Sequence, residues 1–208
     1  MIDVPGLPSF AIEPHNCFAC GTLNATGLGL VLHVERGRSW AELALEPRFQ
    51  GWDGIAHGGI LCTILDEVMA WALVGEDNWG LSARLSVDFK RPIQVGQAIR
   101  AAGWITRSRR RVVDTAAEIR DAGTGSILAT ATGVYVAVDE ARKAEMRKRY
   151  GWVPLPAATG SASSNGSSNP TASSGARASS DATGSSGAFA SSDAAVPSDV
   201  PGAVDGRV

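Results

Sequence analysis

Two adjacent carboxylates, Asp66 and Glu67, interrupt an otherwise apolar run that extends from Gly58 to Val74. The run is rich in Leu, Ile, Ala and Met over about fifteen residues, which favours a helix. An ionised carboxylate that is buried without a partner is unfavourable, so ordinary core packing does not explain these two acids. The pair therefore indicates a functional site, in which one carboxylate faces a cleft.

A glycine pair, Gly58 and Gly59, stands where this helix is expected to begin. The first N–H groups of a helix have no partner within the helix, and they lie at the positive end of its dipole. Without side chains, the two glycines let a ligand approach the backbone closely. This end of the helix is therefore a candidate site for an oxyanion or a polarised carbonyl.

The spacing of these groups constrains how they can act together. Asp66 follows Gly58 by eight residues, which corresponds to about 12 Å along one helix. That separation is too large for both groups to act on one carbonyl. If they serve the same substrate they must come from two chains, so we expect a symmetric homodimer with two composite sites.

The remaining pattern predicts an α+β domain in which an antiparallel sheet of about six strands wraps around one long central helix. Two strands precede the helix, and about four follow it with short links. A segment of alternating charge then predicts a short surface helix. The strands are expected at residues 28–36, 39–45, 80–91, 97–107, 111–121 and 126–138, and the surface helix at 139–150.

Composition divides the chain into three parts: an entry loop (1–27), a folded domain (28–155) and a Ser/Ala/Gly-rich tail (156–208). The tail has almost no large apolar residues, so we expect it to be disordered. Its charges equal the formal net charge of −2, which leaves the rest balanced and predicts no nucleic-acid partner. The central helix carries two acids and is short for a membrane span, and no secretory signal is visible. We therefore expect a cytoplasmic protein without a membrane partner.

Several motifs accompany this layout. They are His57-Gly-Gly with an acid nine residues after the histidine, Gln50-Gly51 before that loop, Cys17-Phe-Ala-Cys-Gly21 followed by Asn24 and Gly27-Leu-Gly-Leu30, and Ser86-Val-Asp-Phe-Lys-Arg-Pro92. Over residues 15–138 the sequence resembles the hotdog-fold acyl-CoA thioesterases of the phenylacetic-acid-pathway (PaaI) type. The resemblance implies a homodimer or homotetramer that hydrolyses an acyl-CoA thioester and uses neither a cofactor nor a metal.

The resemblance also implies roles for single residues. Asp66 would be the general base or the nucleophile, and the Gly58 N–H would bind the thioester oxygen. His57 would orient the loop or contact the acyl group. Many relatives have Asn where this chain has Gly51, so we assign the amide role to the adjacent Gln50.

Other residues are expected to support the site or to bind the nucleotide. Glu67 and Gly59 would have supporting roles, because residues adjacent on a helix point about 100° apart and only one can face a given cleft. The basic run at 107–111 suggests that Arg109 or Arg110 binds the phosphates of CoA, and Arg91 is a weaker candidate. A solvated charge cluster explains the run equally well.

The Cys-x-x-Cys motif raises a separate question. His15, Cys17 and Cys20 would supply three metal ligands, but a structural zinc site normally needs four. We therefore predict no metal, and we expect an ordered loop over the active site instead.

Two other functions fit the same fold. A non-catalytic acyl-CoA-binding module would keep the fold without turnover; the missing Asn at position 51 favours it, and Asp66 argues against it. A hotdog hydratase would need its histidine paired with an acid in a different motif from the one present here.

Overall fold

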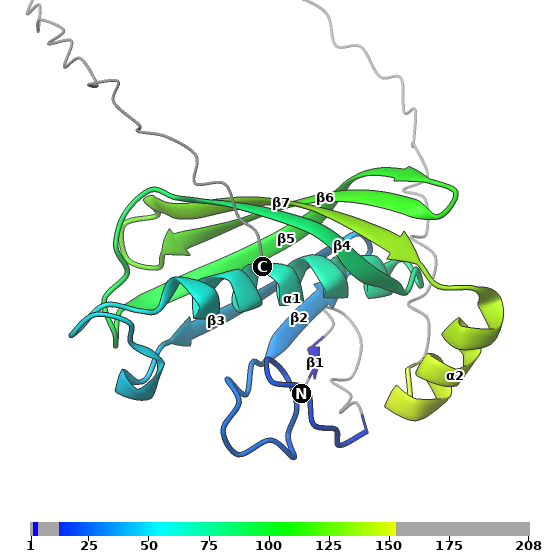
Figure 1. Ribbon diagram of the computed structural model, residues 1–208, viewed down its shortest axis with the longest axis horizontal. Helices are drawn as coiled ribbons and strands as arrows, with labels where there is room; N and C mark the ends of the chain where they lie inside the picture. The colour runs from blue at the N-terminus through cyan, green and yellow to red at the C-terminus, as the bar shows by residue number, and fades with distance from the viewer. Residues whose placement is uncertain (1, 4–12, 153–208) are drawn as a thin grey trace, which may run out of the picture. The chain divides into compact units, whose positions relative to one another are not determined.

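The computed structural model describes residues 2–3 and 13–152 (Figure 1). By its contacts the chain divides into two units, residues 1–160 and 161–208, and all the described residues belong to the first. The predicted disordered tail, residues 156–208, lies outside the described residues, as does part of the predicted entry loop.

One sheet contains every strand of the described domain, in the order β1-β2-β3-β5-β6-β7-β4. All its pairings are antiparallel except that of β1 with β2. Six strands correspond to the six that the sequence predicts, and the two-residue strand β1 was not predicted. The strands are β1 (Ile2–Asp3), β2 (Leu32–Glu35), β3 (Arg38–Ala44), β4 (Gly80–Phe89), β5 (Ala98–Arg109), β6 (Val112–Asp121) and β7 (Ile127–Ala137).

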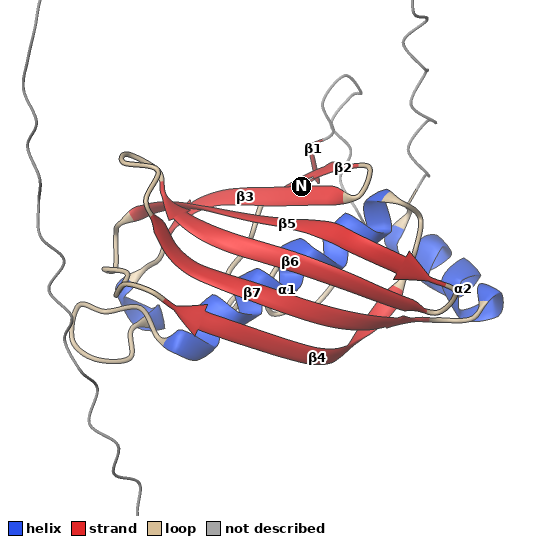
Figure 2. Cartoon of the chain, turned by 90° about the horizontal axis from the view of Figure 1, so that it is seen from above, coloured by secondary structure: helices blue, strands red, loops and turns tan. Residues whose placement is uncertain are grey.

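The long helix α1 (Gly58–Gly75) lies across the concave side of this sheet, and Figure 2 shows the strands passing over it. Ten of its residues are buried, and their side chains pack against the inward residues of the strands. Gly103 of β5 permits this contact, because a Cβ there would lie 2.6 Å from the backbone carbon of Val68. The predicted α+β architecture is confirmed.

By length and composition alone, α1 could cross a membrane, since its mean hydropathy is 1.5 over 18 residues. In the structure, however, 56% of this segment is buried inside the domain. The apolar residues of α1 are therefore explained by their burial under the sheet of the same domain.

The chain before β2 departs from the prediction. A strand was expected from residue 28, but β2 begins only at Leu32. The N–H groups of Leu28 and Leu30 instead donate to the carbonyls of Phe18 and Ala19. The entry loop therefore extends to residue 31 rather than 27. Its described part, residues 13–31, folds on itself before the first long strand pair, and from here on the name entry loop refers to these residues.

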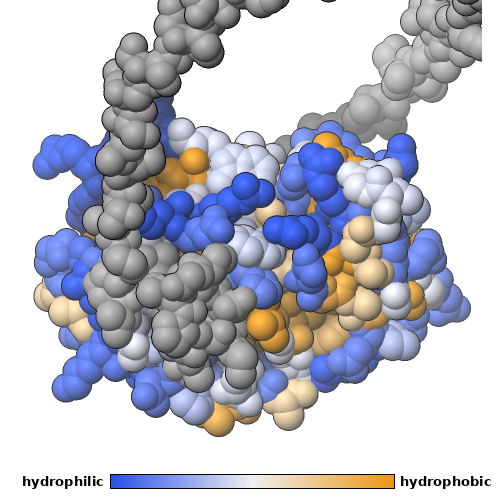
Figure 3. All heavy atoms as spheres, turned by 180° about the vertical axis from the view of Figure 1, so that it is seen from behind, coloured by the Kyte–Doolittle hydropathy of each residue, from blue (hydrophilic) through white to orange (hydrophobic). Residues whose placement is uncertain are grey.

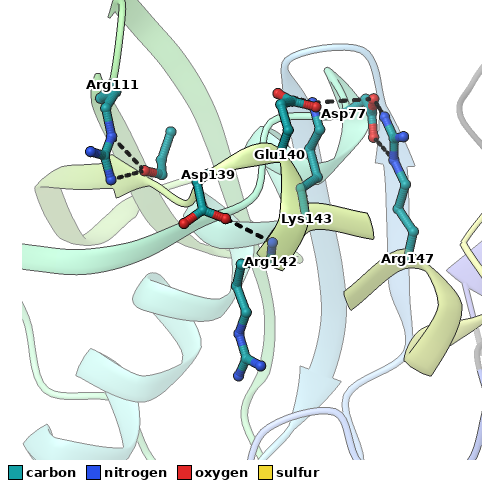
Figure 4. Close-up of polar contacts among 8 residues, drawn as sticks. Asp77, Arg111, Asp139, Glu140, Arg142, Lys143 and Arg147 are labelled. Atoms are coloured by element: carbon teal, nitrogen blue, oxygen red, sulfur yellow. Dashed lines mark hydrogen bonds and ion pairs between the residues drawn. The ribbon is translucent and has the colours of Figure 1, made fainter. Parts of the chain in front are cut away.

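A second helix, α2 (Glu140–Tyr150), follows β7, close to the residue range predicted for it. Asp139 caps its first turn by accepting from the Arg142 N–H at 2.8 Å, and Figure 4 shows this contact. Arg147 and Lys143 form ion pairs with Asp77, which lies just after α1. These contacts fix α2 beside the C-terminal end of α1.

Candidate active site

The Asp66 carboxylate is half-buried on the side of α1 that faces β4 and β7. Its Oδ1 atom accepts two hydrogen bonds, from the Ser82 hydroxyl at 2.8 Å and from the Tyr135 hydroxyl at 2.6 Å. Both donors bind the same oxygen, and among the described residues none donates a hydrogen bond to Oδ2, which can therefore meet a water molecule or a substrate. Hydrogen bonds to a charged acceptor are short and strong, and these two fix the direction in which the carboxylate points.

Tyr135 is a positioning residue that lies almost wholly inside the domain, with 1% of its surface exposed. Its hydroxyl oxygen also lies 3.0 Å from the Asp66 backbone carbonyl, so the single hydroxyl proton is shared between this carbonyl and the closer Oδ1 atom. Burial, and then the neighbouring Asp66 charge, raise the pKa of the Tyr135 hydroxyl well above its usual range. Tyr135 therefore stays protonated and acts as a hydrogen-bond donor.

Sequence reasoning missed both of these donors. Ser82 lies sixteen residues after Asp66, and Tyr135 lies in the last strand. Only the curvature of the sheet over α1 brings them to the carboxylate, and no local pattern carries that information.

The N-terminus of α1 has the free donor that the glycine pair predicted. The His57 Nδ1 atom accepts from the Gly59 N–H at 2.9 Å, so His57 is the N-cap of the helix and orients this turn. The His57 backbone carbonyl accepts from the next two N–H groups, those of Ile60 and Leu61. Among the described residues, no acceptor takes the Gly58 N–H, which is therefore free to bind an oxyanion.

A groove of about 260 Å³ opens in front of Gly58. Its walls are mainly apolar, with Ile55, Leu61 and Phe89 among them, and the exposed Arg91 lies at its rim. A Cβ on Gly58 would lie 3.4 Å from the Phe89 ring, so the glycine leaves room at the floor of the groove. The groove thus combines a free backbone donor, an apolar wall and a cation.

Gln50 has a structural contact in the loop before α1. Its side-chain carbonyl accepts from the Gly54 N–H at 3.1 Å, which closes the loop and leaves the amide NH₂ group as the free end. A Cβ on Gly51 would lie 3.3 Å from the His57 Cα and Cδ2 atoms. A side chain at position 51 would therefore press against His57.

The arginines of the β5–β6 hairpin lie far from Gly58 in the same chain. Arg110 contributes to a cavity with Asp77, beyond the C-terminal end of α1, and that helix is about 27 Å long. Arg109 pairs with Asp114 at 3.5 Å, and Arg110 has a positive φ of 46°. Of the three arginines predicted to bind phosphate, Arg91 is therefore the one that lies near Gly58 of the same chain.

Glu67 points away from Asp66, toward the entry loop, as the 100° step between neighbours on a helix predicts. Its carboxylate accepts from the Trp71 Nε1–H at 2.9 Å and lies 3.9 Å from the Cys17 sulfur. Burial, and then the Cys17 charge, raise the pKa of Glu67 to about 7. Glu67 thus belongs to a second cluster, separate from the Asp66 site.

Cys17 and Cys20 face each other within that cluster. The Cys20 thiol, together with backbone N–H groups, lowers the pKa of Cys17 to about 5, and the same interaction raises the pKa of Cys20. Cys17 is therefore the thiol that ionises first.

Comparison with known proteins agrees with this geometry. Residues 53–128, which include Gly58 and Asp66, match the family model described as the thioesterase superfamily. The crystal structure of the protein RHA08564, described as a thioesterase superfamily protein, is 26% identical with a TM-score of 0.56 and covers 64% of this chain and 72% of that chain. The predicted hotdog fold is thus confirmed, and residues 53–128 are similar to the thioesterase superfamily.

Two further matches define how far the similarity extends. The crystal structure of the TT0310 protein from Thermus thermophilus is 23% identical, has a TM-score of 0.50, and covers 53% of this chain and 93% of that chain, which shows a shared fold. Acyl-coenzyme A thioesterase THEM4 from Xenopus laevis is 27% identical over 90 residues, which are 43% of this chain and 40% of that protein. The hotdog domain therefore matches less than half of the length of that curated relative.

Proposed function

We propose that this protein is an acyl-CoA thioesterase that hydrolyses its substrate to a free acid and CoA. The observation that carries the proposal is the constrained Asp66 carboxylate, with one oxygen held by two hydroxyls and the other free. A binding module would gain nothing from a carboxylate fixed in this way. The match to the thioesterase superfamily and to an acyl-CoA thioesterase supports the same chemistry.

In the proposed reaction, the Asp66 Oδ2 atom takes a proton from a water molecule whose oxygen attacks the thioester carbon. Alternatively, Oδ2 attacks that carbon itself and forms a mixed anhydride, which water then hydrolyses to the free acid. The developing negative charge on the thioester oxygen is bound by the Gly58 N–H, a donor worth about 3 kcal/mol in comparable oxyanion holes. The thiolate of CoA then leaves, and proton transfer completes the free thiol. His57 holds the N-terminal turn of α1 so that the Gly58 N–H points into the groove.

The two groups must come from different chains, because Asp66 and Gly58 lie about 12 Å apart along α1. A two-fold axis near Cys62, halfway between them, would place Gly58 of each helix beside Asp66 of the other. The edge of the sheet supports such a dimer. Strand β4 has no neighbour on its outer side within the described domain, and it exposes Leu81 and Phe89 at 65% and 53%.

A long exposed edge strand readily pairs with another strand, and natural proteins rarely leave one open. The opposite face, in Figure 3, carries many hydrophilic residues together with apolar patches. We propose that β4 pairs with its symmetry mate and that the half-buried side of α1 completes the interface. Homodimers of this kind can associate further into a homotetramer.

Acyl-CoA recognition is assigned to the groove and to the arginines around it. The apolar wall with Phe89 would contact the substrate beside the thioester, and Arg91 would bind a phosphate. In the proposed dimer, the β5–β6 hairpin of the second protomer lies at the same end as Gly58, so Arg109 and Arg110 reach the site from that chain. A cytoplasmic location is part of the same proposal.

The experiment that tests this function measures release of the free CoA thiol from a panel of aromatic, short-chain and medium-chain acyl-CoAs. Asp66→Asn keeps the shape of the side chain and removes the base, so we expect turnover to fall by roughly 10³-fold or more while CoA still binds. Glu42→Gln makes the same acid-to-amide change at an exposed residue of β3, where Glu42 pairs with Arg100, and as the matched control should keep wild-type rates. Turnover of no ester, with CoA binding retained, would favour the acyl-CoA-binding module instead.

A further inference from the structure

The entry loop and α1 converge on a cluster of metal-binding side chains that the proposed thioesterase reaction does not use. The sulfur atoms of Cys17 and Cys20 and a carboxylate oxygen of Glu67 all lie within 4.8 Å of one another. His15 lies beside this group of three on the Cys20 side, with its Nε2 atom 3.4 Å from the Cys20 sulfur. The sequence alone supplied three of these ligands, and Glu67, fifty residues after Cys17, completes a set of four.

We propose that the entry loop and α1 together bind one structural Zn²⁺ ion through four side chains: His15, Cys17, Cys20 and Glu67. Two thiolates, one imidazole and one carboxylate form a donor set that suits tetrahedral zinc. Ligand atoms in such a site are each about 2.0–2.3 Å from the metal, so neighbouring ligand atoms lie about 3.3–3.8 Å apart. The separations of 3.4 Å and 3.9 Å in the cluster are close to this spacing.

The orientation of His15 supports a ligand role. Its Nδ1 atom lies 3.1 Å from the Glu13 backbone carbonyl, which accepts the Nδ1–H and leaves the lone pair on Nε2, facing Cys20. Zinc-binding histidines typically donate their second ring N–H to a carbonyl or carboxylate in this way. His15 is also 4% exposed, so solvent does not account for its position.

The other ligands have supporting contacts of the same kind. The Trp71 Nε1–H donates to the Glu67 carboxylate at 2.9 Å and orients it. The Gly21 N–H donates to the Cys17 backbone carbonyl at 2.9 Å and closes the turn that carries both cysteines. The tight turn behind these contacts requires Gly21, because a Cβ there would lie 2.4 Å from the Cys17 nitrogen.

The charge of the cluster also calls for a cation. Within the described part of the chain, no Lys or Arg forms an ion pair with Glu67. A carboxylate that packs against two cysteines without a cation is unfavourable, and Zn²⁺ would neutralise most of this charge. The ion would fasten the entry loop to α1 at the residue next to Asp66.

The first experiment measures zinc in the purified full-length protein by inductively coupled plasma mass spectrometry, after refolding with Zn²⁺ under reducing conditions and dialysis. We expect about one zinc per chain, bound through the four ligands. Cys62→Ser changes the third cysteine, which lies outside the cluster, and should retain the same zinc content. Double substitution of Cys17 and Cys20 by Ser should abolish it.

The adjacent acids of α1 provide a matched pair of variants. Glu67→Gln should weaken zinc affinity by at least about 10-fold to 100-fold, measured by competition with a chromogenic chelator. Changing a residue that only hydrogen-bonds to a metal ligand already causes a loss of this size. Asp66→Asn should retain full zinc affinity although it loses turnover. Failure of the zinc inference is thus distinguishable from failure of the thioesterase proposal.

Replacement of zinc by Co²⁺ gives a readout that does not depend on the folding of a variant. The wild-type protein should show the thiolate-to-cobalt charge-transfer band and the strong visible bands of tetrahedral cobalt. A wild-type protein that retains no metal and shows no such bands would overturn the proposal. Zinc content that is unchanged in the double cysteine variant, or affinity that is unchanged in Glu67→Gln, would overturn it as well.

Discussion

The hydrogen bond from Tyr135 to Asp66 gives a prediction whose size follows from the structure. Tyr135→Phe removes one hydroxyl and keeps the buried ring, so the core around β7 and α1 stays filled. The lost bond is 2.6 Å long and goes to a carboxylate. Hydrogen bonds to charged groups contribute about 1.5–3 kcal/mol to stability. For a domain of this length, that corresponds to a fall in the melting temperature of roughly 5–10 °C.

The same substitution should lower kcat much more than it raises KM. Tyr135 is buried and cannot touch the substrate, but it fixes the carboxylate that does. If the whole bond energy is used to position Asp66, kcat falls by roughly 10-fold to 100-fold. Ser82→Ala is the matched control. It removes the other, longer hydrogen bond to the same oxygen, at 2.8 Å, and should cost less stability than Tyr135→Phe.

A double-mutant cycle isolates the bond itself. Thermal and urea unfolding would be measured for the wild type, Tyr135→Phe, Asp66→Ala and the double variant. If the bond stabilises the fold, Tyr135→Phe costs less in the Asp66→Ala background, with a coupling energy of about 1–3 kcal/mol. Equal costs in both backgrounds would refute the reasoning.

Two further perturbations test the packing of the helix and the electrostatics of a turn. Gly103→Ala should destabilise the domain by about 1–3 kcal/mol in urea unfolding, because the new Cβ meets the α1 backbone; unchanged stability would show that the helix can move away from β5. Hydrogen bonds, first from Gln97 and then from Thr124, lower the pKa of Asp121 from 3.8 to about 2, so its charged form stabilises the folded state above pH 4. That stability is lost as the pH falls toward 2. The difference in melting temperature between the wild type and Asp121→Asn should therefore shrink over the same pH range. A difference that does not change with pH would contradict this prediction.

The parts of the fold that were predicted correctly are those with a local signal. Alternation and turn residues identified β3 to β7, and the apolar run after the glycine pair identified α1. The start of β2 was placed four residues too early, because Leu28 and Leu30 alternate as in a strand yet donate their N–H groups to the entry loop. Strand β1 has only two residues and too little pattern to predict.

The candidate site was predictable where its parts are close in sequence. The free Gly58 N–H follows from its position at the start of a helix, and the cap by His57 is local as well. By contrast, Ser82 and Tyr135 meet Asp66 only through the curvature of the sheet. Glu67 joins the cysteine cluster only because the entry loop packs on α1. The predicted homodimer and the predicted roles of Arg109 and Arg110 stay predictions.

Gly58→Pro is the variant that removes the proposed oxyanion donor while α1 keeps its first turn. Proline is favoured at the first position of a helix, where it lacks the N–H and keeps the turn. His57, just before it, has φ −68° and ψ 131°, the extended geometry that a residue before proline requires. Gly58→Ala is the matched control, because it also adds a Cβ at the floor of the groove but keeps the N–H, and it should retain much more activity than Gly58→Pro.

The most direct test of the composite site mixes Gly58→Pro and Asp66→Asn protomers, each inactive as a homodimer, by unfolding and refolding them together. If Gly58 of one chain acts with Asp66 of the other, each mixed dimer has one intact site and one site with both defects. Random pairing then restores roughly a quarter of the wild-type rate of CoA release, because half of the dimers are mixed and half of their sites are intact. A mixture that stays inactive although mixed dimers are present would contradict the account, because it would show that both groups act within one chain.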